Sequence, residues 1–296
     1  MRVFLTGASG YIGSAIVQEL IGAGHQVVGL VRSESSAKVL TEAGGEPFMG
    51  SLDDIDGLKR GANAADAVIH TAFIHDFANF AAAAAADKRV IEAFGETLAG
   101  SDRPLIATSG LLGIKPGNGD LITETDASMS PVRLSEAATI AQTERGVRTS
   151  VIRLAPSVHG PGDDHGFIST LITIAREKGV SAYVGAGTNR WPGVHRLDAA
   201  GLYRLALENG TAGSRYNGTA ETGLPLRQIA ELIGERLNLP VRSIAPDQAA
   251  GHFGWMALFA QMDCPASSQQ TQDRLGWNPT HPDLLSDLNA GFYFEQ

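Results

Sequence analysis

Short apolar runs alternate with amphipathic segments along the first half of the chain. The apolar runs, each bounded by Gly, Pro or charged residues, cover residues 2–7, 25–31, 66–72, 103–109 and 148–155. The segments with helical periodicity cover residues 11–23, 34–44, 53–61, 76–99 and 133–146. Apolar runs of this kind are typical of parallel strands that are buried on both faces. The alternation predicts an α/β fold: a doubly wound parallel sheet with right-handed crossovers and helices on both faces.

Beyond residue 156 the alternation becomes less regular. The stretch 160–166, "GPGDDHG", indicates a loop. Helical periodicity returns at 167–178 and 225–239. We expect residues 1–156 to form the sheet domain, with part of 190–217 returning to its sheet. Residues 157–296 are expected to form mainly a smaller C-terminal lobe over the carboxyl edge of the sheet, where open α/β sheets bind ligands.

A glycine-rich stretch joins the first apolar run to the first helix. It reads "LTGASGYIGSAI", residues 5–16, with glycines at Gly7, Gly10 and Gly13. Such a turn lets the backbone approach a pyrophosphate, and the following helix directs unpaired N–H groups and its positive dipole end toward it. The alternative is a tight strand-to-helix turn without a ligand. Because the stretch begins a series of strand and helix alternations, it favours a dinucleotide cofactor.

The end of the second run indicates which dinucleotide is bound. NAD enzymes usually place Asp or Glu there for the ribose 2′-hydroxyl, whereas an Arg accommodates the 2′-phosphate of NADP. This chain has "LVRSESS" at 30–36, which supplies Arg32, Ser33 and Ser36. The pattern predicts NADP(H) rather than NAD(H), and makes 1–156 an NADP-binding domain. The alternative is that Arg32 is only a solvated loop residue.

Composition and charge narrow the class of partner. The chain has 296 residues, is 43% hydrophobic and carries a net charge of −9, which disfavours binding to nucleic acid. No window has the apolar length of a membrane helix, so we expect a cytoplasmic protein with no membrane partner. The lone Cys264 can form neither an internal disulfide nor a multi-thiolate zinc site, and we expect no metal. A small-molecule substrate is the partner that these observations favour.

Five motifs occur in a fixed order along nearly the whole chain. They are "TGASGYIG", "GSLDD" at 50–54, "VIHTA" at 68–72, "TSG" at 108–110 and "SVHGPGD" at 157–163. This ordered set resembles the extended and atypical short-chain dehydrogenase/reductases, the NAD-dependent epimerase/dehydratase-like family. The resemblance implies a Rossmann sheet with a C-terminal substrate lobe.

The resemblance also implies further cofactor contacts. Thr6, Tyr11 and Ile12 would join the glycines in the phosphate-binding turn. Leu52 would lie against the adenine, and Thr71 and Ala72 beside the nicotinamide ribose. The segment from Pro156 to Val158 would run along the nicotinamide. The implied residues are therefore Thr6, Tyr11, Ile12, Leu52, Thr71, Ala72, Pro156 and Val158.

The chain departs from the family where acid-base chemistry normally takes place. Most members carry Tyr-x-x-x-Lys on the helix before the sixth strand. The tyrosines of this chain are at 11, 183, 203, 216 and 293, and none has Lys four residues later. Counting back from the run at 148–155 places Ser128 and Val132 near the usual Tyr and Lys positions. Other side chains must therefore supply the acid-base chemistry.

Five polar residues are candidate substitutes near the carboxyl edge of the sheet: His75, Ser109, Arg133, Glu136 and His159. His159 stands where the family motif usually has tyrosine, and a histidine near neutrality can protonate a developing oxyanion. The alternative for each histidine is a hydrogen-bonded structural ring. Arg133 and Glu136 either orient substrate or form a local helix ion pair.

These features predict an NADP-dependent oxidoreductase that transfers a hydride between nicotinamide and the carbonyl or imine carbon of a small, fairly apolar substrate. Phe253, Trp255 and Phe259 either line the substrate pocket or pack in the core or in a homodimer contact. One alternative is a sugar-nucleotide epimerase or dehydratase, which would need an equivalent base and basic groups for a diphosphate. Another is a sensor that binds NADP without turnover.

Overall fold

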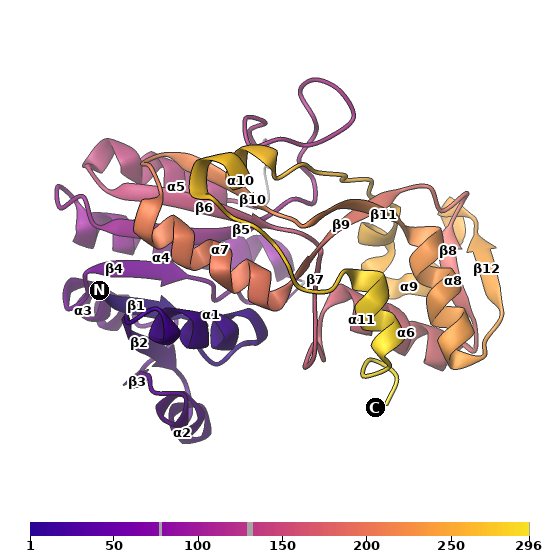
Figure 1. Ribbon diagram of the computed structural model, residues 1–296, viewed down its shortest axis with the longest axis horizontal. Coiled ribbons are helices and arrows are strands. Elements are labelled where there is room, and N and C mark those ends of the chain that lie inside the picture. The colour runs from indigo at the N-terminus through magenta and orange to yellow at the C-terminus, as the bar shows by residue number, and fades with distance from the viewer. Residues whose placement is uncertain (77–78, 129–132, 296) are drawn as a thin grey trace.

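A seven-stranded parallel sheet forms the centre of the protein in the computed structural model, which describes residues 1–76, 79–128 and 133–295. The strand order is β10-β6-β5-β4-β1-β2-β3 (Figure 1). The strands are β1 (Arg2–Thr6), β2 (Gln26–Val31), β3 (Glu46–Met49), β4 (Ala67–His70), β5 (Pro104–Gly110), β6 (Arg148–Leu154) and β10 (Ser214–Gly218). The predicted α/β Rossmann fold is confirmed.

Helices cover both faces of this sheet. They are α1 (Tyr11–Gly22), α2 (Glu34–Glu42), α3 (Ile55–Asn63), α4 (Phe80–Leu98), α5 (Ser135–Ala141) and α7 (Arg196–Asn209). Figure 1 shows α1 and α7 side by side on one face, while α4 packs against α3 and α5 on the other. Side chains of β1 alternate between the faces: Val3 and Leu5 join one core cluster and Phe4 the other. This alternation fastens the sheet to both helical layers.

The C-terminal part adds two small sheets and a group of helices (Figure 1). One sheet has the order β11-β9-β7, and the other pairs β12 with β8. Their strands are β7 (Ser157–His159), β8 (Ser181–Val184), β9 (Arg190–His195), β11 (Glu221–Pro225) and β12 (Val241–Ile244). The helices are α6 (Phe167–Lys178), α8 (Leu226–Leu237), α9 (Ala249–Phe253), α10 (Gln269–Leu275) and α11 (Leu284–Ala290). Within this part of the chain, α7 and β10 belong to the large domain, and α10 packs against both of them (Figure 1).

Two boundaries differ from the sequence expectations. Strand β3 was not among the predicted runs, because it is a four-residue edge strand, "EPFM", that stays partly exposed. The predicted helix at 133–146 is α-helical only over Ser135–Ala141, and Gln142–Arg145 form a tighter 3₁₀ turn. Arg133 therefore precedes the helix. No helix in the described ranges is both long and apolar enough to cross a membrane.

Candidate cofactor and active site

The glycine turn after β1 is built so that two backbone segments approach closely. Gly7 has a φ of +78°, and a Cβ added there would lie 2.5 Å from Thr71 Oγ1. A Cβ at Gly13 would lie 1.9 Å from the Gly7 carbonyl oxygen. The Gly10 N–H donates to that same oxygen at 2.9 Å. Side chains at Gly7 and Gly13 would therefore open the turn.

The turn presents the amino end of α1 at the carboxyl edge of the sheet. Gly10 is the N-cap and contributes no side-chain cap, and the first N–H groups of a helix have no acceptor within it. Tyr11 and Ile12 begin the helix, and both are half-buried. These backbone donors and the helix dipole fit a pyrophosphate.

Tyr11 connects this turn to the C-terminal lobe. Its hydroxyl donates to the Gly160 carbonyl at 3.0 Å, and the Arg196 guanidinium lies 4.7 Å from the centre of its ring. Arg196 also donates to the Pro161 carbonyl at 3.0 Å and to Ser14 Oγ at 3.1 Å. The loop after β7 is thus held beside the helix terminus that would bind the cofactor. Just before that loop, the predicted residues Pro156 and Val158 are half-buried.

At the adenosine end, Arg32 directly follows β2 and is exposed. Ser33 is the N-cap of α2, and its hydroxyl accepts the Ser36 N–H at 3.2 Å. Leu52 packs partly buried against the core cluster on its face of the sheet. An exposed guanidinium, nearby hydroxyls and a helix N-terminus therefore lie together at the end of β2.

Where the resemblance places the nicotinamide ribose, the residues after β4 are fixed against β1. Thr71 Oγ1 donates to the Thr6 carbonyl at 2.8 Å, and the Ala72 N–H lies 3.4 Å from Thr6 Oγ1. The Thr6 side chain is fully buried. Its hydroxyl therefore supports the end of the neighbouring strand.

A chain of buried hydrogen bonds continues from Thr6 toward α5. Thr6 Oγ1 lies 2.6 Å from His70 Nδ1, and His70 Nε2 lies 3.0 Å from Asp87 Oδ1. Ser135 Oγ donates to the second oxygen of Asp87 at 2.6 Å. Arg133 Nε donates to Ser135 Oγ at 3.0 Å. We call these five residues the Asp87 network.

Arg133 and His75 meet around the ring of Phe73. The Arg133 guanidinium lies 4.0 Å from the ring centre, and the His75 ring packs edge-on with a centroid distance of 5.5 Å. Desolvation of the His75 ring is the larger cause that lowers its pKa, and the charge of Arg133 is the second. Ser109 lies near the end of β5 and is 4% exposed. The carboxyl edge of the sheet thus carries a cation, a titratable ring and a hydroxyl.

Glu136 does not pair within its helix. Its carboxylate takes two hydrogen bonds of 2.7 Å from the fully buried Arg153 and one of 2.7 Å from Arg215. Hydrogen bonds from Arg153 and the charge of Arg153 outweigh the effect of burial, so the pKa of Glu136 is lowered. The expected helix pair with Arg133 fails because Arg133 precedes α5. Glu136 is therefore a buried structural counter-ion in this structure, not a group open to substrate.

His159 also has buried partners. Its Nδ1 lies 2.6 Å from Asp287 of α11, and its Nε2 lies 3.6 Å from Glu221 of β11. The ring is 1% exposed. The structure thus places His159 in a charged cluster that fastens α11 to the small sheet, apart from the contacts of His75 and Arg133. This geometry favours the structural alternative for His159.

Sequence reasoning missed three members of the Asp87 network: His70, Asp87 and Ser135. One clue was available, because Asp87 is the acid that follows the alanine tract "AAAAAA" on the buried face of α4. A buried acid on an apolar face needs a partner. Val132, near the position of the family lysine, lies outside the described residues. Ser128 donates its backbone N–H to Glu136 Oε1 at 3.1 Å.

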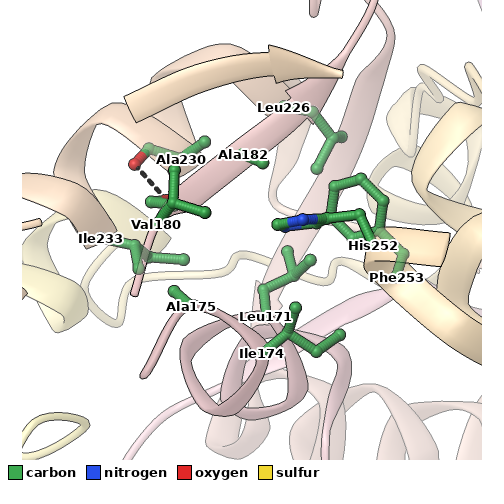
Figure 2. A pocket seen from close by; sticks show the side chains of 11 residues that line it. Leu171, Ile174, Ala175, Val180, Ala182, Leu226, Ala230, Ile233, His252 and Phe253 are labelled. Atoms are coloured by element: carbon green, nitrogen blue, oxygen red, sulfur yellow. Dashed lines mark hydrogen bonds between the residues drawn. The ribbon is translucent and has the colours of Figure 1, made fainter. Parts of the chain in front are cut away.

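A cavity of about 10 Å³ lies in the C-terminal lobe, between α6, β8, α8 and α9. Figure 2 shows its apolar lining, with the His252 ring directed toward the space beside Phe253. That volume holds about one water molecule, so the cavity is too small for a substrate. Phe253 is 3% exposed and belongs to the core, whereas Trp255 is 46% exposed.

The chain belongs to the NAD-dependent epimerase/dehydratase family, whose model matches residues 3–217. An uncharacterized protein of Schizosaccharomyces pombe is 52% identical over 99% of this chain and 100% of its own length. A 4-hydroxy-2-methyl-3-oxo-4-farnesyl-3,4-dihydroquinoline-1-oxide ketoreductase of Stigmatella aurantiaca is 29% identical over 90% of this chain and 84% of its own.

Solved structures show the same fold. A dTDP-glucose 4,6-dehydratase from Streptomyces venezuelae, with NAD bound, superimposes with a TM-score of 0.80 at 18% identity. The superposition covers 100% of this chain and 98% of the dehydratase. The resemblance to the NAD-dependent epimerase/dehydratase family that the sequence motifs suggested is confirmed.

Proposed function

We propose that the protein is an NADP(H)-dependent oxidoreductase that reduces a carbonyl or imine carbon of a small, fairly apolar substrate. One observation carries the proposal: a turn that fits a dinucleotide pyrophosphate lies at the same sheet edge as Arg133, His75 and Ser109. The ketoreductase activity named for the Stigmatella aurantiaca relative supports carbonyl chemistry.

The cofactor is proposed to be NADP(H) because of the groups at the end of β2. Arg32 is exposed there, next to the N-terminus of α2 and the hydroxyls of Ser33 and Ser36. A guanidinium and a helix N-terminus both favour a phosphate dianion. A bound NADPH would supply the hydride for the substrate carbon, and the electron pair of the carbon–oxygen π bond would then move to the substrate oxygen.

Side chains of the protein then stabilise the substrate oxygen and supply its proton. Arg133 and Ser109 hold it by hydrogen bonds as its negative charge develops. His75 donates the proton that completes the hydroxyl, and returns to its charged form by taking a proton from water. Phe73, whose ring contacts both His75 and Arg133, supplies an apolar wall. Delivery to an already protonated imine needs no such proton, so His75 matters less there.

Cofactor preference is tested by fluorescence titration of NADPH and NADH. We expect NADPH to bind about tenfold more tightly or better, since a charge-assisted contact contributes roughly 1.5 to 3 kcal/mol. Arg32→Ala should remove most of that preference, whereas Arg242→Ala, an exposed arginine on β12, should leave it intact. Equal affinities in the unaltered protein would exclude the proposed role of Arg32.

The reaction is tested by following NADPH absorbance with benzaldehyde, acetophenone and a cyclic imine. We expect oxidation of NADPH that depends on the added substrate. Binding of NADPH without oxidation by any of these compounds would instead support the sensor alternative.

A further inference from the structure

The hydrogen bonds made to Asp87 have a fixed direction. A carboxylate only accepts hydrogen bonds, so His70 must donate to Asp87 through Nε2 and Ser135 through its hydroxyl. The other ring nitrogen of His70, Nδ1, lies 2.6 Å from the Thr6 hydroxyl oxygen. Ser135 has given its only hydrogen to Asp87, so its oxygen accepts the Arg133 Nε–H. The hydrogen bonds from His70 and Ser135, and the one from Arg133 to Ser135, therefore all run toward Asp87.

Charge also ties Arg133 to Asp87. Burial alone would raise the pKa of Asp87, but the hydrogen bond and charge of His70, the hydrogen bond from Ser135 and the charge of Arg133 bring it below its usual value. The four members other than Arg133 are at most 4% exposed. An ionised carboxylate in such surroundings needs a compensating cation, and an arginine stays charged in proteins. Arg133, held through Ser135, is one cation that favours the ionised form of Asp87.

The location of Arg133 gives the network a function. Arg133 comes one residue after Val132, the position that counting assigns to the lysine of the family pair. Its guanidinium lies over Phe73, the ring that also contacts His75. The opposite end of the network, Thr6, adjoins Gly7 of the cofactor turn. The network thus spans the distance between the predicted cofactor and the proposed oxygen-binding group.

We propose that Asp87 is a positioning residue that, acting through Ser135, holds the Arg133 guanidinium in place for the carbonyl oxygen of the substrate. This inference rests on the proposed carbonyl reduction. It assigns to Arg133 a fixed hydrogen-bond donor role that needs no proton transfer, while the proton comes from His75. The missing Tyr-x-x-x-Lys pair is thereby replaced by an arginine whose orientation is set from the protein interior.

The first test needs no substrate or cofactor. The ¹⁵N–¹H signal of Arg133 Nε, assigned by its loss in Arg133→Lys, should exchange slowly with solvent. Asp87→Asn and Ser135→Ala should shift this signal and speed its exchange. Thr139→Val is the matched control, because it removes a buried hydroxyl of the same helix that donates to the Ser135 carbonyl. The control should leave the Arg133 signal in place.

The second test measures turnover with benzaldehyde as the probe. Asp87→Asn and Ser135→Ala should each lower kcat by about 10²-fold, the effect typical of a misplaced reactive group, with the NADPH Kd within about twofold of the unaltered protein. Thr139→Val should retain its kcat. Free guanidinium ion should restore activity to Arg133→Ala, but not to Arg133→Ala combined with Asp87→Asn.

The outcomes separate the inference from the function on which it rests. An unmoved Arg133 Nε signal in Asp87→Asn, or guanidinium rescue that is indifferent to Asp87, would overturn the positioning role while carbonyl reduction stands. Absence of turnover of any carbonyl compound by the unaltered protein would overturn the proposed function and, with it, the role of Arg133 toward substrate. The NMR result would still show whether Asp87 fixes Arg133.

Discussion

At the scale of single residues, the surroundings of His75, the proposed proton donor, set the direction of its pKa shift. Partial burial and the neighbouring Arg133 charge both disfavour its protonated form. Its pKa therefore lies below the ordinary value near 6.5. At neutral pH the ring is mostly neutral, and its capacity to donate a proton increases as the pH falls.

We expect carbonyl reduction to show this titration. With a saturating carbonyl substrate, kcat should be highest at acid pH and should decrease as the pH rises through the lowered pKa of His75. His75→Gln should lower the acid plateau by about 10²-fold and flatten the profile, since general acid catalysis contributes roughly that much. Reduction of a preformed iminium ion should change less. A pH profile of His75→Gln that matches that of the unaltered protein would assign the proton to another donor.

The sequence predicted the residues that act locally and missed those that act at a distance. Gly7 and Gly13 could be identified because their spacing alone defines the turn. His70 and Asp87 are 17 positions apart, and Asp87 and Ser135 are 48 apart. Each pair joins residues of two different elements, so the periodicity of a single helix or strand could not predict the contact. For the same reason, the partners of Glu136 on β6 and β10 could not be read from the sequence.

At the scale of elements, strands buried on both faces were predictable and the edge strand was not. Strands β1 and β4 lie in the middle of the sheet, and their residues from Val3 to Thr6 and from Ala67 to His70 are buried. β3 has one neighbour and keeps Glu46 exposed, so its hydrophobic pattern is broken. An unbroken run of apolar residues indicates that a strand is buried on both faces. A strand that stays partly exposed has no such run, and this pattern therefore misses it.

Helix α5 is attached to the sheet through charge. Glu136 on α5 is 2% exposed and pairs with Arg153 of β6, whose side chain is fully buried. Glu136→Gln should lower the free energy of unfolding by about 3 to 5 kcal/mol, because it leaves a buried guanidinium without its counter-ion. Urea unfolding followed by circular dichroism measures the loss.

Glu96→Gln is the control for this substitution. Glu96 makes an equally short ion pair with Lys59, 2.8 Å long, but at the protein surface. Solvent screens such a pair, so the urea midpoint should barely change. If both variants lose the same stability, burial does not explain the importance of Glu136.

At the scale of the whole molecule, a charged cluster fastens α11 to the small sheet. Burial alone would lower the pKa of His159, but hydrogen bonds and charges from Asp287 and Glu221 raise it above its usual value. The folded protein thus binds this proton more tightly than the unfolded chain. His159 contributes stability at pH values below its unfolded pKa, and that contribution is lost as the pH rises through its folded pKa.

The stability of His159→Gln relative to the unaltered protein should therefore depend on pH. We expect the variant to be less stable by about 3 to 5 kcal/mol at about pH 5.5, where the buried pair with Asp287 is complete, and by less at about pH 8.5. Burial lowers the pKa of the neighbouring His195, which opposes the trend in each protein, but it cancels in the comparison. A difference in unfolding free energy that stays constant with pH would contradict this account.

The contacts of Tyr293 can form only late in the synthesis of this chain. Its hydroxyl accepts the Gly160 N–H at 3.3 Å and donates to Asp163 at 3.0 Å, so it supports the loop that Tyr11 holds from the other side. Gly160 and Tyr293 are 133 positions apart. A ribosome needs roughly 7 to 27 s to cover that stretch at about 5 to 20 residues per second. The strands from β1 to β6 have left the exit tunnel well before then. A nascent chain can therefore form its glycine turn long before Tyr293 can support the loop at Gly160.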